Sequence, residues 1–210
     1  MRTLKVQGKG RVTAEPEIVI LKFDLAAKSN RYEEALRSLS AKTDGLLLGL
    51  KSAGLQREQL KTSDFVVRTT SKYHDGKSHF TGFKAEHEFI IELPFSKQKL
   101  QEVLRHLAVE KIGAEIGMSF TVRDKEALRK KAMARAVELA RENAEVLASA
   151  ANVKLGSLVQ MEYGWSEIHV YDRNATMLCE AQFPADYDPD IEPRDVSAED
   201  NVTLVFEILD

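Results

Sequence analysis

The chain begins with two segments in which hydrophobic and polar residues alternate, as in β-strands with one buried face. Residues 3–13 form the first segment, which contains Gly8 and Gly10. The second segment follows Pro16, and its hydrophobic residues fall on every second position (Val19, Leu21, Phe23 and Leu25). Both segments are predicted to be strands.

Three later segments have the three-to-four-residue hydrophobic spacing of amphipathic helices. The first is predicted to begin at a capping-box-like Asn30 and to end at Gly54, and the second to begin at Ser96. The third, residues 125–151, follows a cap at Asp124. Its inward positions are mostly alanine, which lets a helix lie close to a sheet (Leu128, Ala132, Ala136, Ala140, Ala144, Leu147 and Ala151).

A long β-hairpin is predicted between the first two helices, with its turn at Asp75 and Gly76. Its return strand alternates strictly, so Glu86 and Glu88 are expected to face water. The opposite, hydrophobic face is expected to carry Phe83, Ala85, His87, Phe89, Ile91 and Leu93. Strands are also predicted near residues 116–122, 159–165 and 202–208, whereas residues 166–197 lack regular periodicity.

This order, ββαββαβαββ, predicts an α+β fold with antiparallel sheets covered by helices on one face. The 210 residues fit one domain, residues 1–210, or two closely packed lobes of about 1–80 and 81–210. A chain of this length buries enough surface to fold without disulfides or metals.

The charge argues against a nucleic-acid partner, because the net charge is −3 and such proteins concentrate Lys and Arg. No hydrophobic run reaches the length of a membrane span. The first residues lack the apolar core of a signal peptide, so a cytoplasmic protein is expected, or a periplasmic one if a leader has been removed.

The most distinctive chemical pattern is an acidic stretch with carboxylates at Asp186, Asp188, Asp190 and Glu192, spaced as in the first half of a calcium loop. Ile191 takes the place of the obligatory glycine, and no glutamate follows at the twelfth position. A solvated acidic loop is therefore expected. A calcium-binding module through residues 186–192 stays open as an alternative function.

The other polar motifs are incomplete. Gly8-Lys9-Gly10 lacks the third glycine of a phosphate loop and is expected to mark a strand bend or bulge. Ser119 lacks the closing glycine of a nucleophile elbow, and Cys179 has no local base, so it is expected to be a buried or half-buried thiol. The histidines lack metal-ligand spacing, although His74 and His79 flank one turn (His74, His79, His87, His106 and His169). We therefore predict no catalytic residue, cofactor site or metal site.

Several short signatures occur in a fixed order along nearly the whole chain: Val6-Gln7-Gly8-Lys9-Gly10, Glu15-Pro16-Glu17, Thr81-Gly82-Phe83-Lys84-Ala85, the alanine-rich helix running into Asn152-Val153-Lys154-Leu155-Gly156, and Ile191-Glu192-Pro193. In this order the chain resembles the SIMPL domain family, which includes the bacterial YggE-type proteins. The family often has Pro-Asp where this chain has Pro16-Glu17.

The resemblance implies a binding or assembly protein, since the family has no agreed enzymatic activity. Its members are linked to oxidative-stress protection in bacteria and to a signalling adaptor role in animals. The leading hypothesis is a non-catalytic stress-associated or scaffold protein that acts through self-assembly or partner binding. An unrecognised hydrolase is a further alternative.

Residues 165–183 form a long connection that is unusually apolar for its position. So much hydrophobic surface needs cover, either from the chain's own core or from another copy. We therefore expect a homo-oligomer in which this segment contacts a neighbouring subunit.

Overall fold

A computed structural model describes residues 2–109, 112–164, 175–178 and 191–209. The chain forms two compact units. Unit 1 comprises Met1–Glu17, Thr121–Asp172 and Pro193–Asp210, and unit 2 comprises Ile18–Phe120 and Arg173–Glu192. Unit 1 combines the two ends of the chain because its first and last strands pair, so the units do not follow lobes of about 1–80 and 81–210.

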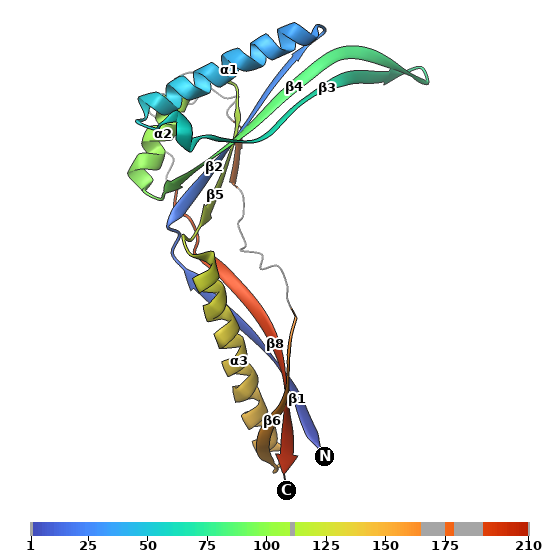
Figure 1. The fold of residues 1–210 in the computed structure, drawn as a ribbon, viewed down its shortest axis with the longest axis vertical. Coiled ribbons are helices and arrows are strands. Elements are labelled where there is room, and N and C mark those ends of the chain that lie inside the picture. Colours follow the sequence, from blue (N-terminus) through green and yellow to red (C-terminus); the bar gives the residue numbers. More distant parts are fainter. Residues whose placement is uncertain (1, 110–111, 165–174, 179–190, 210) are drawn as a thin grey trace. The chain divides into compact units, whose positions relative to one another are not determined.

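Unit 1 contains a three-stranded antiparallel sheet in the order β1-β8-β6. Its strands are β1 (Thr3–Ala14), β6 (Lys154–Tyr163) and β8 (Val196–Leu209). The helix α3 (Lys125–Ala150) packs on this sheet (Figure 1). Asp124 is its N-cap, as predicted, and the Asp124 carboxylate accepts the backbone N–H of Ala127 at 2.8 Å.

The alanine stripe of α3 packs directly on β1, which confirms the prediction of close helix–sheet packing. Its buried residues are Leu128, Ala132, Ala136, Ala140, Ala144 and Ala148. Ala148 continues the stripe in place of Leu147, which is 49% exposed. No bulge forms at Gly8 and Gly10, because β1 pairs with β8 without any register shift. These glycines are needed because backbone atoms of α3 occupy the space that a Cβ would fill.

Unit 2 contains a five-stranded antiparallel sheet in the order β3-β4-β2-β5-β7. Its strands are β2 (Ile18–Ser29), β3 (Lys61–His74), β4 (Lys77–Pro94), β5 (Glu115–Thr121) and β7 (Ala175–Leu178). Two α-helices and a short 3-10 helix complete the unit: α1 (Tyr32–Ser52), α2 (Lys97–Val109) and η1 (Arg57–Gln59). The predicted α+β fold with antiparallel sheets is therefore confirmed, and β7 is a short strand that the sequence pattern did not reveal.

The helices α1 and α2 cover one face of the unit 2 sheet, and a single hydrophobic core lies between them and the strands (Figure 1). Phe23 and Phe89 lie directly opposite each other in β2 and β4, and both are 0% exposed. His87 lies on this covered face, whereas Glu86 and Glu88 on the other face keep 26% and 29% of their side chains exposed. The predicted register of β4 is therefore confirmed.

Local signals were predicted with mixed success. The turn at Asp75 and Gly76 is confirmed, with positive φ angles of 49° and 73°. The cap at Asn30 was wrong. Arg31 occupies the N-cap position, where no side chain forms a capping hydrogen bond. Ser29 instead organises this corner, since its hydroxyl accepts the Arg31 N–H at 3.1 Å and donates to Glu34 at 2.9 Å.

Across the described ranges, no helix combines the length and the hydrophobicity that crossing a bilayer would require.

Candidate functional site

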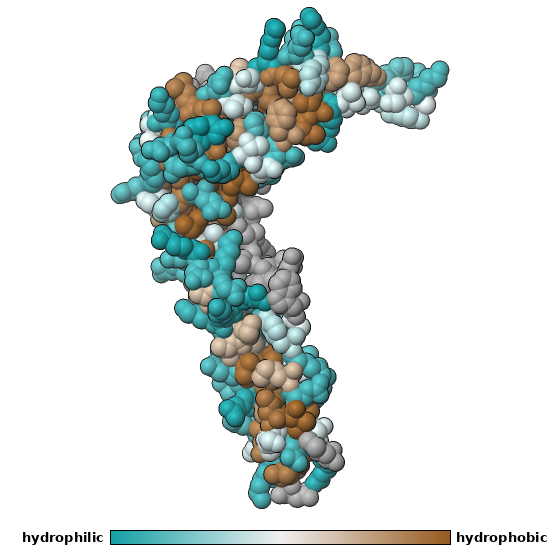
Figure 2. All heavy atoms as spheres, viewed as in Figure 1, coloured by the Kyte–Doolittle hydropathy of each residue, from teal (hydrophilic) through white to brown (hydrophobic). Residues whose placement is uncertain are grey.

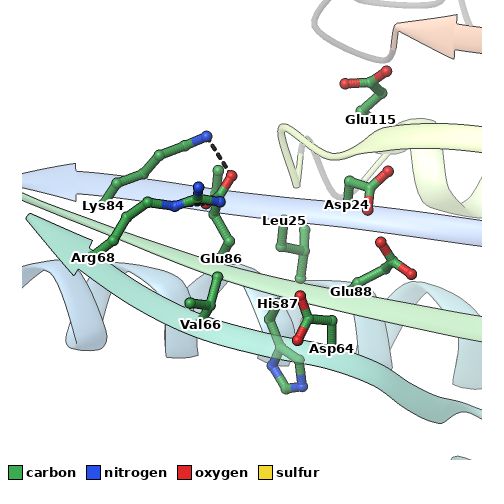
Figure 3. Close-up of a pocket in the computed structure, with 11 residues that line it drawn as sticks. Asp24, Leu25, Asp64, Val66, Arg68, Lys84, Glu86, His87, Glu88 and Glu115 are labelled. Atoms are coloured by element: carbon green, nitrogen blue, oxygen red, sulfur yellow. Dashed lines mark hydrogen bonds and ion pairs between the residues drawn. The ribbon is translucent and has the colours of Figure 1, made fainter. Parts of the chain in front are cut away.

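The face of the unit 2 sheet that α1 and α2 leave uncovered carries many charged side chains. It contains a groove of about 320 Å³, which we call the charged groove (Figure 3). The residues lining it are Asp24, Leu25, Ala26, Asp64, Val66, Arg68, Lys84, Glu86, His87, Glu88 and Glu115. They come from four strands that are far apart in the sequence, so no local sequence motif could predict the groove.

One part of the groove is an ion-pair cluster around Glu86. Its carboxylate contacts the ammonium of Lys84 and accepts a hydrogen bond from Arg68 Nε at 2.8 Å (Figure 3). The hydrogen bond from Lys84, together with that from Arg68, outweighs burial and lowers the pKa of Glu86. Glu86 is therefore a stable anion that holds two cations in place.

A second cluster joins two carboxylates that lie directly opposite each other, Asp24 in β2 and Glu88 in β4. Lys22 Nζ lies 2.6 Å from Glu88 and 3.4 Å from Asp24. Ser63 donates a further hydrogen bond to Glu88 at 2.5 Å.

These contacts shift the two carboxyl groups in opposite directions. The hydrogen bond from Lys22 lowers the pKa of Glu88. Burial raises the pKa of Asp24, and the negative charge of Glu88 adds to that rise against the opposing effect of Lys22. Such divergent pairs occur at acid–base centres, but structural ion-pair networks produce them as well.

The chemistry open to the groove is electrostatic binding. Its lining carries five carboxylates and two cationic side chains, which favours a cationic or hydrogen-bond-donating group over an anion. Among the described residues, no cluster of three His, Cys, Asp or Glu side chains could hold a metal ion.

A hydroxyl–imidazole contact lies on the other face of the same strands, the face that the helices cover. Thr62 Oγ1 and His87 Nε2 are 3.0 Å apart. Phe65 and Phe89 contact the imidazole ring, with centroid distances of 5.1 and 3.8 Å. Burial, with a smaller contribution from Arg57, lowers the pKa of His87. Within the described ranges no carboxylate hydrogen-bonds its other nitrogen, so the third member of a catalytic triad is missing.

The tip of the β3–β4 hairpin forms the other prominent surface. The last pair between β2 and β4 joins Ser29 and Phe83, so among the described strands β3 alone pairs with β4 before that point. All residues from 71 to 81 are exposed, and we call this two-stranded segment the arm. Tyr73 and Phe80 lie on one face of it, with 78% and 57% of their surface exposed.

An aromatic row continues from the arm toward α1. Phe80 packs against Phe83 at 5.3 Å, and Phe83 packs against Tyr32 at 5.6 Å. Hydrophobic atoms reach the surface where the arm leaves the rest of the sheet (Figure 2). Exposed aromatic groups of this kind are enriched at protein interfaces.

The family model described as SIMPL, protein of unknown function (DUF541), matches residues 4–206. The chain belongs to the SIMPL family. The match runs from β1 into β8 and therefore includes both units. No curated protein matches the chain.

Several of the candidate residues predicted for this SIMPL chain lie outside the part that the structure describes. Cys179, His169, Asp186, Asp188 and Asp190 lie outside the described residues. Residues 165–183 also lie outside the described residues, apart from the backbone of β7, which pairs with β5. The calcium and thiol hypotheses and the predicted interface segment therefore stay predictions.

The described candidates do not converge on one site. Glu192 is exposed, and Ser119 lies in β5 on the face opposite Met118. His74 contacts its neighbour Asp75 at 3.1 Å, while His79 lies opposite Lys72. Sequence reasoning missed the Thr62–His87 contact, because it depends on a register shift between Thr62 and Asp64 that alternation cannot reveal.

Proposed function

We propose that this SIMPL-family chain is a non-catalytic assembly protein, which acts by binding other copies of itself or a protein partner. The observation that carries the proposal is the arm. An isolated two-stranded ribbon is only marginally stable in water, and this one exposes two aromatic side chains on one face. Both features favour a surface that is completed by another protein chain.

The charged groove supports the non-catalytic part of the proposal. Glu86 and Glu88 are engaged by Lys84, Arg68 and Lys22, so they are held as ion-pair partners rather than poised to transfer protons. The imidazole of His87 contacts two aromatic rings and the Thr62 hydroxyl, and no carboxylate of the described residues bonds it. The role in oxidative-stress protection that the family implies would then depend on binding another protein chain and not on catalysis.

Size-exclusion chromatography coupled to light scattering tests the proposal at tens to hundreds of micromolar. We expect the wild type to form oligomers and the variant Tyr73→Ser/Phe80→Ser to lose the contact made by the arm, which lowers the average mass. The matched control, Lys72→Ser/Lys77→Ser, alters two exposed lysines of the same arm and is expected to stay assembled. A strictly monomeric wild type would contradict self-assembly and leave only a separate protein partner.

A further inference from the structure

The strand β3 is an edge of the described unit 2 sheet, with β4 as its only neighbour (Figure 1). An edge strand presents unpaired backbone N–H and C=O groups that can pair with another strand. The register of β3 against β4 shifts between Thr62 and Asp64 and again between Thr70 and Ser71. Between these shifts, residues 64–70 form a regular run suited to pairing.

The backbone direction of this run follows from a local hydrogen bond. The N–H of Phe65 donates to the carboxylate of Asp64 at 2.9 Å, so it points away from β4. Because backbone groups alternate along a strand, Val67 and Thr69 share this outward direction. The outer edge of β3 therefore offers donors and acceptors at odd-numbered positions.

The two faces of β3 differ in chemistry. Asp64, Val66 and Arg68 line the charged groove on the open face (Figure 3). Phe65 and Val67 lie on the face covered by the helices, where Val67 packs against the core and Phe65 keeps 53% of its surface exposed. Any strand added here must match charges on one face and hydrophobic groups on the other.

We propose that β3 pairs antiparallel with β3 of a second copy, around a two-fold axis at Val66. Val66 then lies opposite Val66 of the second copy, and Phe65 lies opposite Val67. Asp64 lies opposite Arg68 on the open face, and the symmetry repeats this opposite-charge pair. The inference rests on the proposed function, because it specifies one interface for self-assembly.

Neighbouring registers are less complementary. An axis through Phe65 places Asp64 opposite Val66, and an axis through Val67 places Arg68 opposite Val66. An axis between two residues sets open-face positions against covered-face positions, which the pleat does not permit. Only the axis at Val66 matches opposite charges on one face and hydrophobic groups on the other.

The proposed pairing is compatible with the contacts that β3 already makes. Arg68 bonds Glu86, yet 60% of its side chain is exposed, so it can also reach a carboxylate across the edge. The Phe65 N–H exchanges the Asp64 carboxylate for a carbonyl of the second copy. The added strand also covers the exposed ring of Phe65.

Cysteine cross-linking tests the axis directly, in a Cys179→Ser background that removes the native thiol. In an antiparallel pair, directly opposite Cβ atoms lie about 4.5–5.5 Å apart, close to disulfide geometry. We therefore expect Val66→Cys to form a disulfide-linked dimer under mild oxidation. The control is Thr69→Cys, an exposed position whose two copies would be about 20 Å apart and should stay unlinked.

Charge reversal supplies a second test that does not depend on a new thiol. Arg68→Asp should raise the dimer dissociation constant about tenfold, because both Asp64–Arg68 pairs become repulsive. The double variant Asp64→Arg/Arg68→Asp should restore association. Both variants lose the internal bond from Arg68 to Glu86, so a difference between them reports the contact between copies.

The outcomes separate the two proposals. If Val66→Cys cross-links no more than Thr69→Cys, and the double reversal gives no rescue, the β3 pairing is wrong. If light scattering still shows oligomers in that case, assembly by another surface stands. If the wild type is strictly monomeric at high micromolar concentration, both self-assembly and the β3 pairing fail.

Discussion

Gly8 and Ala136 lie so close together that a Cβ added to Gly8 would stand 1.9 Å from the carbonyl oxygen of Ala136. Gly10 repeats this relationship one helical turn away, with 2.0 Å to the carbonyl oxygen of Ala132. The atoms in the way belong to the backbone of α3, so they cannot rotate aside. The glycines of β1 and the alanines of α3 are therefore two halves of one packing surface.

Gly8→Ala should destabilise the protein by about 3 kcal/mol or more, at the upper end of the cost of overpacking, because α3 must move away from β1. Urea unfolding measures this change. The matched control is Gly117→Ala in β5, where the nearest atom to an added Cβ is Lys22 Cβ at 3.5 Å, an ordinary contact. Equal stabilities of the two variants would contradict the close-packing explanation.

The Gly8–Ala136 contact also shows what the sequence could predict. The spacing of alanines along residues 125–151 predicted a closely packed helix, and alternation predicted the strands. Neither pattern reveals that this helix lies on β1, because the contact joins residues far apart in the chain. The bulge predicted at Gly8 and Gly10 was wrong, because the sequence could not show that these glycines make room for the backbone of α3.

The charged groove was harder to predict, because its lining comes from β2, β3, β4 and β5. Alternation placed Glu86 and Glu88 on the exposed face, but it could not give Lys22 or Ser63 as partners of Glu88. Those contacts depend on the register between strands. The predicted N-cap at Asn30 was also wrong, because the Ser29 hydroxyl, and not the Asn30 side chain, accepts the backbone N–H at the start of α1.

Phe89→Ala should cost about 3–5 kcal/mol of unfolding free energy, because Phe89 is 0% exposed and packs opposite Phe23 in the core. Phe65→Ala is the matched control, since Phe65 is 53% exposed and should cost much less in a monomer. Denaturant unfolding at low protein concentration measures both. A midpoint unchanged by Phe89→Ala would refute its place in the core.

His87 should make stability fall as the pH drops below about 6.5, its ordinary pKa. Burial lowers the pKa of His87 in the folded state, so the unfolded chain binds a proton first. Its contribution is therefore complete above pH 6.5 and is lost as the pH falls through the folded pKa.

Thermal unfolding between pH 7.5 and 5 tests this, with His87→Gln as the comparison. The variant should lose less stability than the wild type over that range. Glu86 and Glu88 do not confuse the result, because their lowered pKa values shift their contribution to pH below 4.5. Parallel pH profiles would show that His87 is not the titrating group.

Asp24→Asn should stabilise the protein at pH 7, although it removes one partner of Lys22. The ordinary pKa of an Asp side chain is 3.8, and burial raises the pKa of Asp24 above that value in the folded state. A raised folded pKa means that protonated Asp24 favours folding below pH 3.8, and that this benefit is lost as the pH rises through the folded pKa. At pH 7 the wild type carries a charge that its site disfavours, whereas asparagine keeps a neutral amide at every pH.

The stabilisation should therefore narrow as the pH falls through the folded pKa of Asp24 toward 3.8. Lys22 retains Glu88 at 2.6 Å, the shorter of its two contacts, so the loss of its 3.4 Å contact with Asp24 costs little. Glu92→Gln, at an exposed position of β4, is the matched control and should leave the denaturant midpoint unchanged. If Asp24→Asn lowers the midpoint at pH 7, the attraction of Lys22 outweighs burial and the repulsion of Glu88, and the two carboxylates form a stabilising cluster instead.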